Sequence, residues 1–305
     1  MTTKKKKGLL YHLARDTDLY IMLLPAMVLV FIFSYMPIFG IVLAFKEYDI
    51  LQGIWGSPWV GLKYFQQFFN DPYFFRITKN TILLSFFGIL FGFPAPIILA
   101  LFLNELKALR FKRIIQSISY LPHFVSTVVI VGIMMYMFDA YGIVNDILRF
   151  IGIPEQVFFS DSKWFRTLYI GSGIWQGIGW DAIIYLAAIA GINPELYEAA
   201  VLDGANRWQN MWHITLTSIM SVVRILLILE IGGLFGIGFE KVYLMYNPGI
   251  YDVADVVSTY VYRRGIIGMD FSYSAAVGLF NSIVNFTLIF IANYISRKIS
   301  DEGLW

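Results

Sequence analysis

The stretch LYIMLLPAMVLVFIFSYMPIFGIVLAF, residues 19–45, decides the fold class, because its 27 consecutive residues include no Asp, Glu, Lys or Arg. A helix needs about 20 apolar residues to cross a bilayer. Three more uncharged stretches of 25 or 26 residues are long enough to do so: 80–104, 114–138 and 271–296. Two further apolar stretches are interrupted by charges, 167–191 by Asp181 and 217–239 by Arg224 and Glu230. We therefore predict an all-α, polytopic membrane protein with six transmembrane helices.

The composition of the whole chain supports this prediction. Of its 305 residues, 58% are hydrophobic and 14% are charged, whereas a soluble domain is about 45–50% apolar and about 25% charged. No linker or low-complexity segment separates a soluble unit, so residues 1–305 are predicted to form a single transmembrane domain. Cysteine is absent, which excludes disulfides, zinc–thiolate sites and iron–sulfur clusters.

Motifs for catalysis are also missing from the sequence. It contains no G-x-x-x-x-G-K-[ST] loop for ATP phosphates, no H-E-x-x-H and no G-x-S-x-G. The three histidines, His12, His123 and His213, lie far apart in the sequence. We therefore expect no catalytic residue, no metal site and no nucleic-acid partner, and we predict that the chain is not an enzyme.

The distribution of basic residues predicts the orientation in the membrane. Segments 1–18, 104–113, 192–216 and 297–305 carry 12 Lys and Arg in 62 positions, and segments 46–79, 139–166 and 240–270 carry 10 in 93. Because cytoplasmic loops are richer in Lys and Arg, we expect a multi-pass protein of the cell membrane with both termini in the cytoplasm.

The connection between the fourth and fifth stretches, residues 192–216, contains NPELYEAAVLDGANRWQNMWHITL. Asn193 can cap a helix that starts at Pro194, and Gly204 can end it in a left-handed conformation. Asn206 and Gln209 form the pattern of a capping box for a second helix. We predict two short helices that project into the cytoplasm, where the first either docks into a partner's groove or lies on the lipid headgroups.

This connection resembles the EAA motif of permeases from binding-protein-dependent ABC importers. The match comprises Glu198-Ala199-Ala200, Gly204, Ile214 and Leu216, and it departs at Thr217, where the family usually has proline. The resemblance implies that the loop is a coupling loop that docks onto a cytoplasmic ATP-binding subunit. The residues to which this role is carried are Glu198, Ala199, Ala200, Asp203 and Gly204.

Segments along nearly the whole chain, among them GSPWVGLKYF, SYLPHFVSTVV and DVVSTYVYRRGIIGMDFSYSAAVGLFNS, are similar to the polysaccharide and oligosaccharide branch of the carbohydrate-uptake permeases. The resemblance implies import of an oligosaccharide by alternating access, driven by ATP and Mg on a partner, with no cofactor on this chain. It also implies a second homologous permease in a heterodimer, two ATP-binding subunits and an extracytoplasmic solute-binding protein. The alternative is a self-sufficient secondary transporter or channel, which needs a coupling-ion site and inverted repeats that the sequence does not display.

Polar and aromatic residues within the spans are candidates for a substrate path, because sugars are held by aromatic stacking and by hydrogen bonds from amides and carboxylates. We predict this role for Trp175, Gln176, Trp180, Asp181, Glu230, Asn281 and Asn285. Charges inside a membrane are costly and face a cavity or a partner. Asp181 and Glu230 therefore either bind sugar hydroxyls or pair with Arg224 or a neighbouring subunit.

Overall fold

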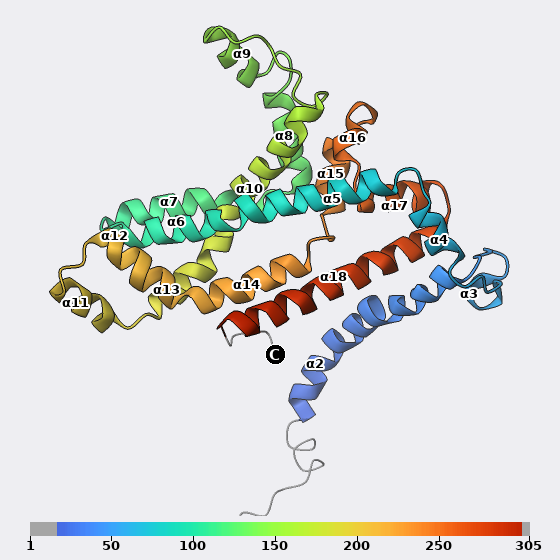
Figure 1. Ribbon diagram of the computed structural model, residues 1–305, viewed down its shortest axis with the longest axis horizontal. Coiled ribbons are helices and arrows are strands. Elements are labelled where there is room, and N and C mark those ends of the chain that lie inside the picture. The colour runs from blue at the N-terminus through green and yellow to red at the C-terminus, as the bar shows by residue number, and fades with distance from the viewer. Residues whose placement is uncertain (1–16, 301–305) are drawn as a thin grey trace, which may run out of the picture.

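The computed structural model describes residues 17–300 of the chain, and this part is built from helices and loops (Figure 1). Its only strand-like pairing is an isolated antiparallel bridge between Lys46 and Trp59. The predicted all-α class is confirmed.

Four helical segments are long and apolar enough to cross a membrane without interruption. They are α2 (Thr17–Val30) with its continuation to Phe45, α5 (Phe74–Phe87) with α6 (Pro94–Glu105), α10 (Ser162–Ala190), and α18 (Phe271–Ser300). Two bent pairs pass the same test: α7 (Leu109–Tyr120) with α8 (Thr127–Met137), and α12 (Arg207–Asn210) and α13 (Leu216–Ser218) with α14 (Met220–Gly232). The described residues thus contain four spans, or six if each bent pair is counted as one.

The third predicted stretch, 114–138, is not one straight helix but a bent pair of helices, which passes the same test for a membrane span only when the two are counted together. α7 and α8 meet at an angle of 102°. Pro122, which lacks an N–H donor, lies in a short 3₁₀ turn between them, and Ser126 caps the new helix by accepting a hydrogen bond from the N–H of Val129. The break therefore comes from turn chemistry within an apolar run.

The fifth predicted stretch, 217–239, also differs from the structure. α14 ends at Gly232, and residues 233–238 are not helical. Three short helices follow before α18: α15 (Phe239–Met245), α16 (Tyr251–Ala254) and α17 (Val257–Tyr262). The chain thus leaves the fifth span seven residues earlier than its hydropathy predicts.

Three buried clusters hold the helices together. One joins α8, α10 and α15 through residues such as Met134, Leu168 and Val242. A second packs Phe68 of α4 (Lys63–Phe69) against Tyr273 of α18. The third lies between α6, α10 and α14 and includes Ala100, Tyr185 and Val223.

Close packing of α10 depends on one glycine. A Cβ on Gly179 would lie 2.2 Å from the backbone oxygen of Ser119 in α7, so the two helices cross where no side chain fits. A Cβ on Gly171, two turns earlier in α10, would have no atom within 4 Å. Of the glycines along this helix, Gly179 therefore sets the crossing with α7.

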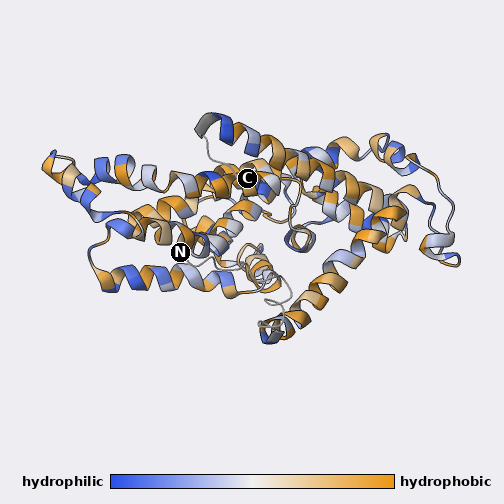
Figure 2. Cartoon of the chain, turned by 90° about the horizontal axis from the view of Figure 1, so that it is seen from below, coloured by the Kyte–Doolittle hydropathy of each residue, from blue (hydrophilic) through white to orange (hydrophobic). Residues whose placement is uncertain are grey.

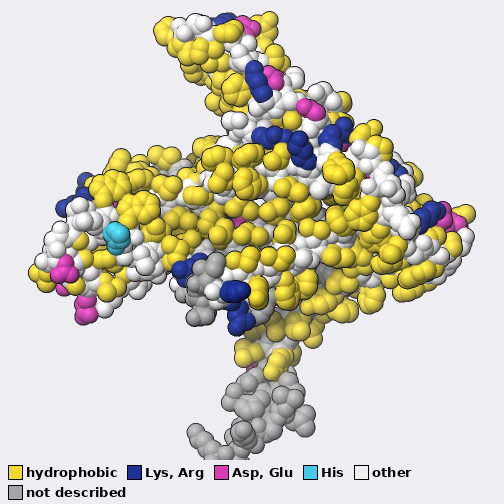
Figure 3. Space-filling model, in the orientation of Figure 1, with side chains coloured by type: hydrophobic (Ala, Val, Ile, Leu, Met, Phe, Trp, Pro, Cys, Tyr) yellow, Lys and Arg dark blue, Asp and Glu magenta, His cyan; other side chains and the backbone are white. Residues whose placement is uncertain are grey.

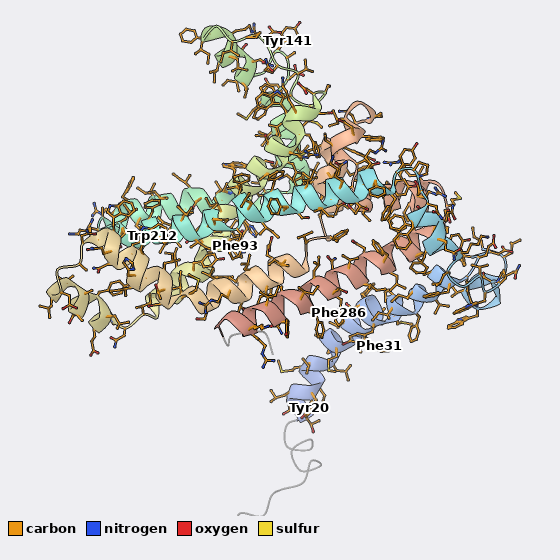
Figure 4. All side chains as sticks on the ribbon, viewed as in Figure 1. Tyr20, Phe31, Phe93, Tyr141, Trp212 and Phe286 are labelled. Carbon is orange, nitrogen blue, oxygen red and sulfur yellow. The ribbon has the colours of Figure 1, made fainter. Side chains whose placement is uncertain are left out.

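The surface is apolar over the middle of the long helices. Orange residues cover these helices in Figure 2, and the face in Figure 3 is yellow across its centre, with many of the charged side chains toward its margins. α2 has no buried residue and stands apart from the other helices (Figure 1). In Figure 4 its Tyr20 projects away from the bundle. An apolar surface of this extent needs lipid or a partner to cover it.

Candidate functional site

The first helix of the loop between α10 and α14 forms as its signals predict. α11 (Pro194–Leu202) is capped by Asn193, whose side chain accepts a hydrogen bond from the N–H of Glu195 at 3.1 Å. Gly204, just beyond its end, has a φ of +83°, which glycine adopts without the strain that a side chain would add. The predicted start and end of this helix are both confirmed.

The second helix, α12, begins with the predicted capping box. The Asn206 side chain accepts a hydrogen bond from the N–H of Gln209 at 2.9 Å, and the Gln209 side chain accepts one from the N–H of Asn206 at 2.8 Å. Each helix therefore begins with a cap supplied from within three residues of it.

α11 presents its side chains away from the rest of the chain. It has no buried residue and lies at the far left end of the molecule in Figure 1. Glu198 is exposed, and its carboxylate makes no hydrogen bond or ion pair with any residue between 17 and 300. The Tyr197 hydroxyl, 3.0 Å from that of buried Thr215, ties the helix to the start of the fifth span.

A pocket of about 320 Å³ opens between α11 and α12. Ala200, Asp203 and Gly204 line one side of it, and His213 and Ile214 line the other. The predicted coupling residues are therefore grouped at one end of the molecule, on the exposed helix and the pocket beside it.

A larger cavity, of about 490 Å³, lies between α5–α6, α10 and α14. The α5–α6 helix contributes Gly88, Gly92, Phe93 and Pro96, around a π-helical turn at Gly88–Gly92. Such turns often occur at functional sites within helices. In Figure 4, Phe93 lies between the layers that contain α6 and α14.

Carboxylates from two helices line this cavity. Asp181 comes from α10 and Glu230 from α14, and Tyr185, which is 3% exposed, lies on the same wall as Asp181. Gln176 also lines the cavity and donates a hydrogen bond from its amide to the Val125 carbonyl at 3.2 Å. Three of the seven predicted path residues therefore meet at one cavity.

Lys241 of α15 supplies a cation to the same cavity, and sequence reasoning did not identify it. Its Nζ donates to the Tyr169 carbonyl at 2.9 Å and lies 5.0 Å from the centre of the Tyr169 ring. No carboxylate within residues 17–300 lies within 4 Å of it. Burial lowers the pKa of the Lys241 ammonium to about 8.

The two predicted tryptophans lie outside the cavity. The Trp180 ring stacks on His123, with centroids 4.4 Å apart and planes 1° from parallel, beside the break between α7 and α8. Trp175 borders a separate apolar pocket of about 540 Å³ between α8 and α10. Both side chains are partly exposed, and neither lines the cavity that contains the carboxylates.

Asn281 and Asn285 of α18 hold the break that follows α14. Asn285 Oδ1 accepts a hydrogen bond from the N–H of Phe235 at 2.8 Å, and the Asn281 amide donates to the Phe235 carbonyl at 3.0 Å. The two side chains replace the partners that a helix would have given Phe235. One atom of each amide is thus bound to the backbone, while the buried Asn281 Oδ1 has no hydrogen-bond partner among the described residues.

At the end opposite α11, fully buried Asp255 accepts hydrogen bonds from two arginines. Arg263 Nη2 lies 2.7 Å and Arg76 Nη2 3.4 Å from its Oδ2. Asn80 donates to the backbone carbonyl of Asp255 at 3.0 Å, and Arg166 donates to Asn80 Oδ1 at 3.4 Å. This network joins α5 and α10 to the residues that flank α17 (Val257–Tyr262), Asp255 before it and Arg263 after it.

Comparison with known proteins adds to this geometry. Residues 88–301 match the family model described as "Binding-protein-dependent transport system inner membrane component". The chain is similar to protein LplB of Bacillus subtilis (strain 168), at 45% identity over 306 residues, 100% of this chain and 96% of that protein. It is 44% identical over 303 residues to the polygalacturonan/rhamnogalacturonan transport system permease protein YteP of the same organism, 99% of this chain and 94% of that one.

Among solved structures, the chain is similar to one chain of a bacterial alginate ABC transporter in complex with alginate pentasaccharide-bound periplasmic protein. The TM-score is 0.89 and the identity 40%, and the match covers 98% of this chain and 100% of the other. The likeness therefore extends over both candidate regions, the exposed α11 and the charged cavity.

Proposed function

Because the chain belongs to the family of inner membrane components of binding-protein-dependent transport systems, it is a transport subunit, and we propose that its cargo is an oligosaccharide or a polysaccharide fragment. The relatives named for polygalacturonan/rhamnogalacturonan and for alginate support this cargo. So does the cavity, whose carboxylates, amide and tyrosines are suited to bind hydroxyl groups.

In the proposed assembly, this chain pairs with a second homologous permease in a heterodimer. Two ATP-binding subunits hold ATP and Mg, and an extracytoplasmic solute-binding protein delivers the sugar. α2 supports the presence of a second permease, because none of its residues is buried within this chain and a partner helix could cover them. The alginate transporter to which the chain is similar was solved with a periplasmic protein.

The observation that carries the proposal is the exposed α11. Its acidic and small side chains, Glu198, Ala199 and Ala200, are without partners in the described chain and follow a helix start that is fixed by its cap. A short, preformed helix of this kind fits a groove on an ATP-binding subunit. ATP-driven closure of that subunit would move α11, and the Tyr197–Thr215 contact would pass the movement to the fifth span.

The proposal also fixes the orientation. Six spans place both termini on the side of α11, and the greater density of Lys and Arg on that side supports a cytoplasmic location. Alternating access then opens the cavity between α10 and α14 to each side in turn. A secondary transporter is the weaker alternative, because it leaves the exposed α11 without a purpose.

The test is to change α11 and measure association of the ATP-binding subunit. Glu198→Ala should weaken co-purification and transport-linked ATP hydrolysis, since a hydrogen bond to a charged group contributes about 1.5–3 kcal/mol. Gly204→Leu should do the same. Because ATP-binding subunits reach α11 only from the cytoplasm, the experiment also tests the orientation.

Two matched variants control for general damage. Gly152 has a φ of +78° and, like Gly204, has no atom within 4 Å of an added Cβ, so Gly152→Leu carries the same backbone strain of ~1–2 kcal/mol. Glu155→Ala removes an exposed glutamate far from α11. Normal transport and ATPase association in the Glu198 and Gly204 variants would show that α11 is not the docking helix.

A further inference from the structure

Two cations, Lys241 of α15 and Arg166 of α10, lack a carboxylate partner among the described residues. Within residues 17–300 the Lys241 ammonium is held by the Tyr169 carbonyl and ring. Arg166 donates to Asn80 Oδ1 at 3.4 Å, and its buried Nε has no hydrogen-bond partner. No Asp or Glu within residues 17–300 lies within 4 Å of either cation.

Other arginines nearby are paired. Arg76 and Arg263 share Asp255, and Arg264 lies 3.5 Å from both Asp71 and Asp270. Taking a charge out of water without a counter-charge is expensive, so buried cations are normally paired.

Buried Lys46 also has no carboxylate partner within residues 17–300, but it donates to two backbone carbonyls, of Ile54 and Trp55. Lys241 has one carbonyl acceptor and lines a cavity, and it therefore points to an anion that is supplied from outside the chain.

Lys241 lies in the proposed substrate path. It lines the cavity together with Tyr169 and Gly173, and an added Cβ on Gly173 would lie 3.4 Å from Lys241 Nζ. Arg166, one turn before Tyr169 on α10, is not among the residues that line this cavity and belongs to the Asp255 network.

The two carboxylates of the cavity, Asp181 and Glu230, lie away from Lys241. Asp181 follows Gly173 by eight residues, which is about 12 Å along a helix that rises 1.5 Å per residue. The cavity therefore has a basic end, at Lys241, and an acidic end, at Asp181 and Glu230. An anionic group can pair with Lys241 while hydroxyl groups further along the ligand donate to the carboxylates.

We propose that Lys241 binds a carboxylate group of a uronic-acid residue and makes this permease selective for acidic over neutral oligosaccharides. This inference rests on the proposed function, because it assigns a charge to the sugar that the cavity admits. An ammonium provides the charge-assisted hydrogen bonds that a sugar carboxylate needs.

The competing explanation is that Lys241 only ties α15 to α10 through the Tyr169 carbonyl. The two explanations differ in what they predict for a neutral ligand. A tie between helices affects every substrate equally, whereas a carboxylate-binding residue affects only the charged one.

The experiment compares uptake of labelled trigalacturonate with uptake of its methyl ester, which has the same sugar backbone without charge. Cells carry the complete transporter with its own binding protein and one of three versions of this chain: wild type, Lys241→Gln or Lys241→Arg. Because the binding protein is the same throughout, differences between versions come from the permease. Lys163→Gln, which removes an exposed lysine of α10 that pairs with Asp161, is the matched control.

We expect Lys241→Gln to lower trigalacturonate uptake by about tenfold or more, as follows from losing one hydrogen bond to a charged group. Uptake of the ester and the yield of assembled complex should be unchanged. Lys241→Arg should restore most of the acid uptake, and Lys163→Gln should behave as wild type.

Equal losses for acid and ester in Lys241→Gln would overturn the inference and leave Lys241 as a tie between helices. The inference would also be overturned if cells with the wild-type chain took up the ester but not trigalacturonate. If cells with the wild-type chain took up neither sugar, both the inference and the proposed function would be contradicted, so the two failures can be told apart.

Discussion

The loop that carries α11 and α12 is ordered differently from the rest of the molecule. Each helix of the loop is capped from within three residues of its start, by Asn193 and by the Asn206–Gln209 pair. Halfway along α18, Asn285 holds Phe235, 50 residues away, and at the end opposite α11, Asp255 is held by Arg76, 179 residues away. The loop can therefore keep its shape while it moves as a unit, whereas these two regions keep their shape only while α5 and α18 stay in place.

The strongest test of this difference is Asp255→Ala. It leaves Arg76 and Arg263 without their shared carboxylate, and breaking a buried ion pair costs about 3–5 kcal/mol. We expect a large fall in the thermal unfolding temperature of the purified complex, or loss of assembled complex.

The control for this variant is Glu47→Ala. Glu47 pairs with Lys63 at 3.0 Å, but both side chains are about half exposed, so the loss should be within about 1 kcal/mol. If Asp255→Ala unfolded at the wild-type temperature, the long-range network would not be what orders this end.

The same difference explains how much could be predicted from the sequence. The apolar stretches and the caps at Asn193, Gly204 and Asn206 are local signals, and they predicted the helix class and the two short helices of the loop correctly. The breaks after Tyr120 and Gly232 interrupt apolar runs, so hydropathy alone did not reveal them. The second break also depends on amides from α18.

The residues of the candidate site also differ in whether a local sequence signal reveals them. Asp181 and Glu230 were identified because charges deep in an apolar span are rare, and the structure places both at one cavity. Lys241 was missed because it lies beyond the last apolar residue of its stretch, where a lysine resembles any loop lysine. Asn281 and Asn285 are predicted for the substrate path, and the structure adds a contact of each side chain with the Phe235 backbone, which sequence spacing does not reveal.

A smaller effect is expected for Asn285→Ala. It leaves the N–H of Phe235 without its partner at a buried position, which costs about 1–3 kcal/mol. Hydrogen exchange should become faster over residues 233–238 and remain unchanged over α11 and α12.

Ser282→Ala serves as the control, because this exposed serine of α18 bonds only to its own helix, at the Gly278 carbonyl. Faster exchange in the coupling loop of Asn285→Ala would mean that the two regions are linked more tightly than their contacts indicate.

The smallest effect is expected for Asn206→Ala. It removes the cap of α12, and loss of such a cap costs about 1 kcal/mol. Because the cap is local, hydrogen exchange should become faster over α12 alone, and the unfolding temperature of the complex should change little. Asn206→Asp keeps an acceptor for the N–H of Gln209 and should exchange as wild type. If Asn206→Ala lowered the unfolding temperature as much as Asp255→Ala, the loop would be held by the whole bundle and not by its own caps. It could then not move as the preformed unit that transmission from an ATP-binding subunit to the fifth span requires.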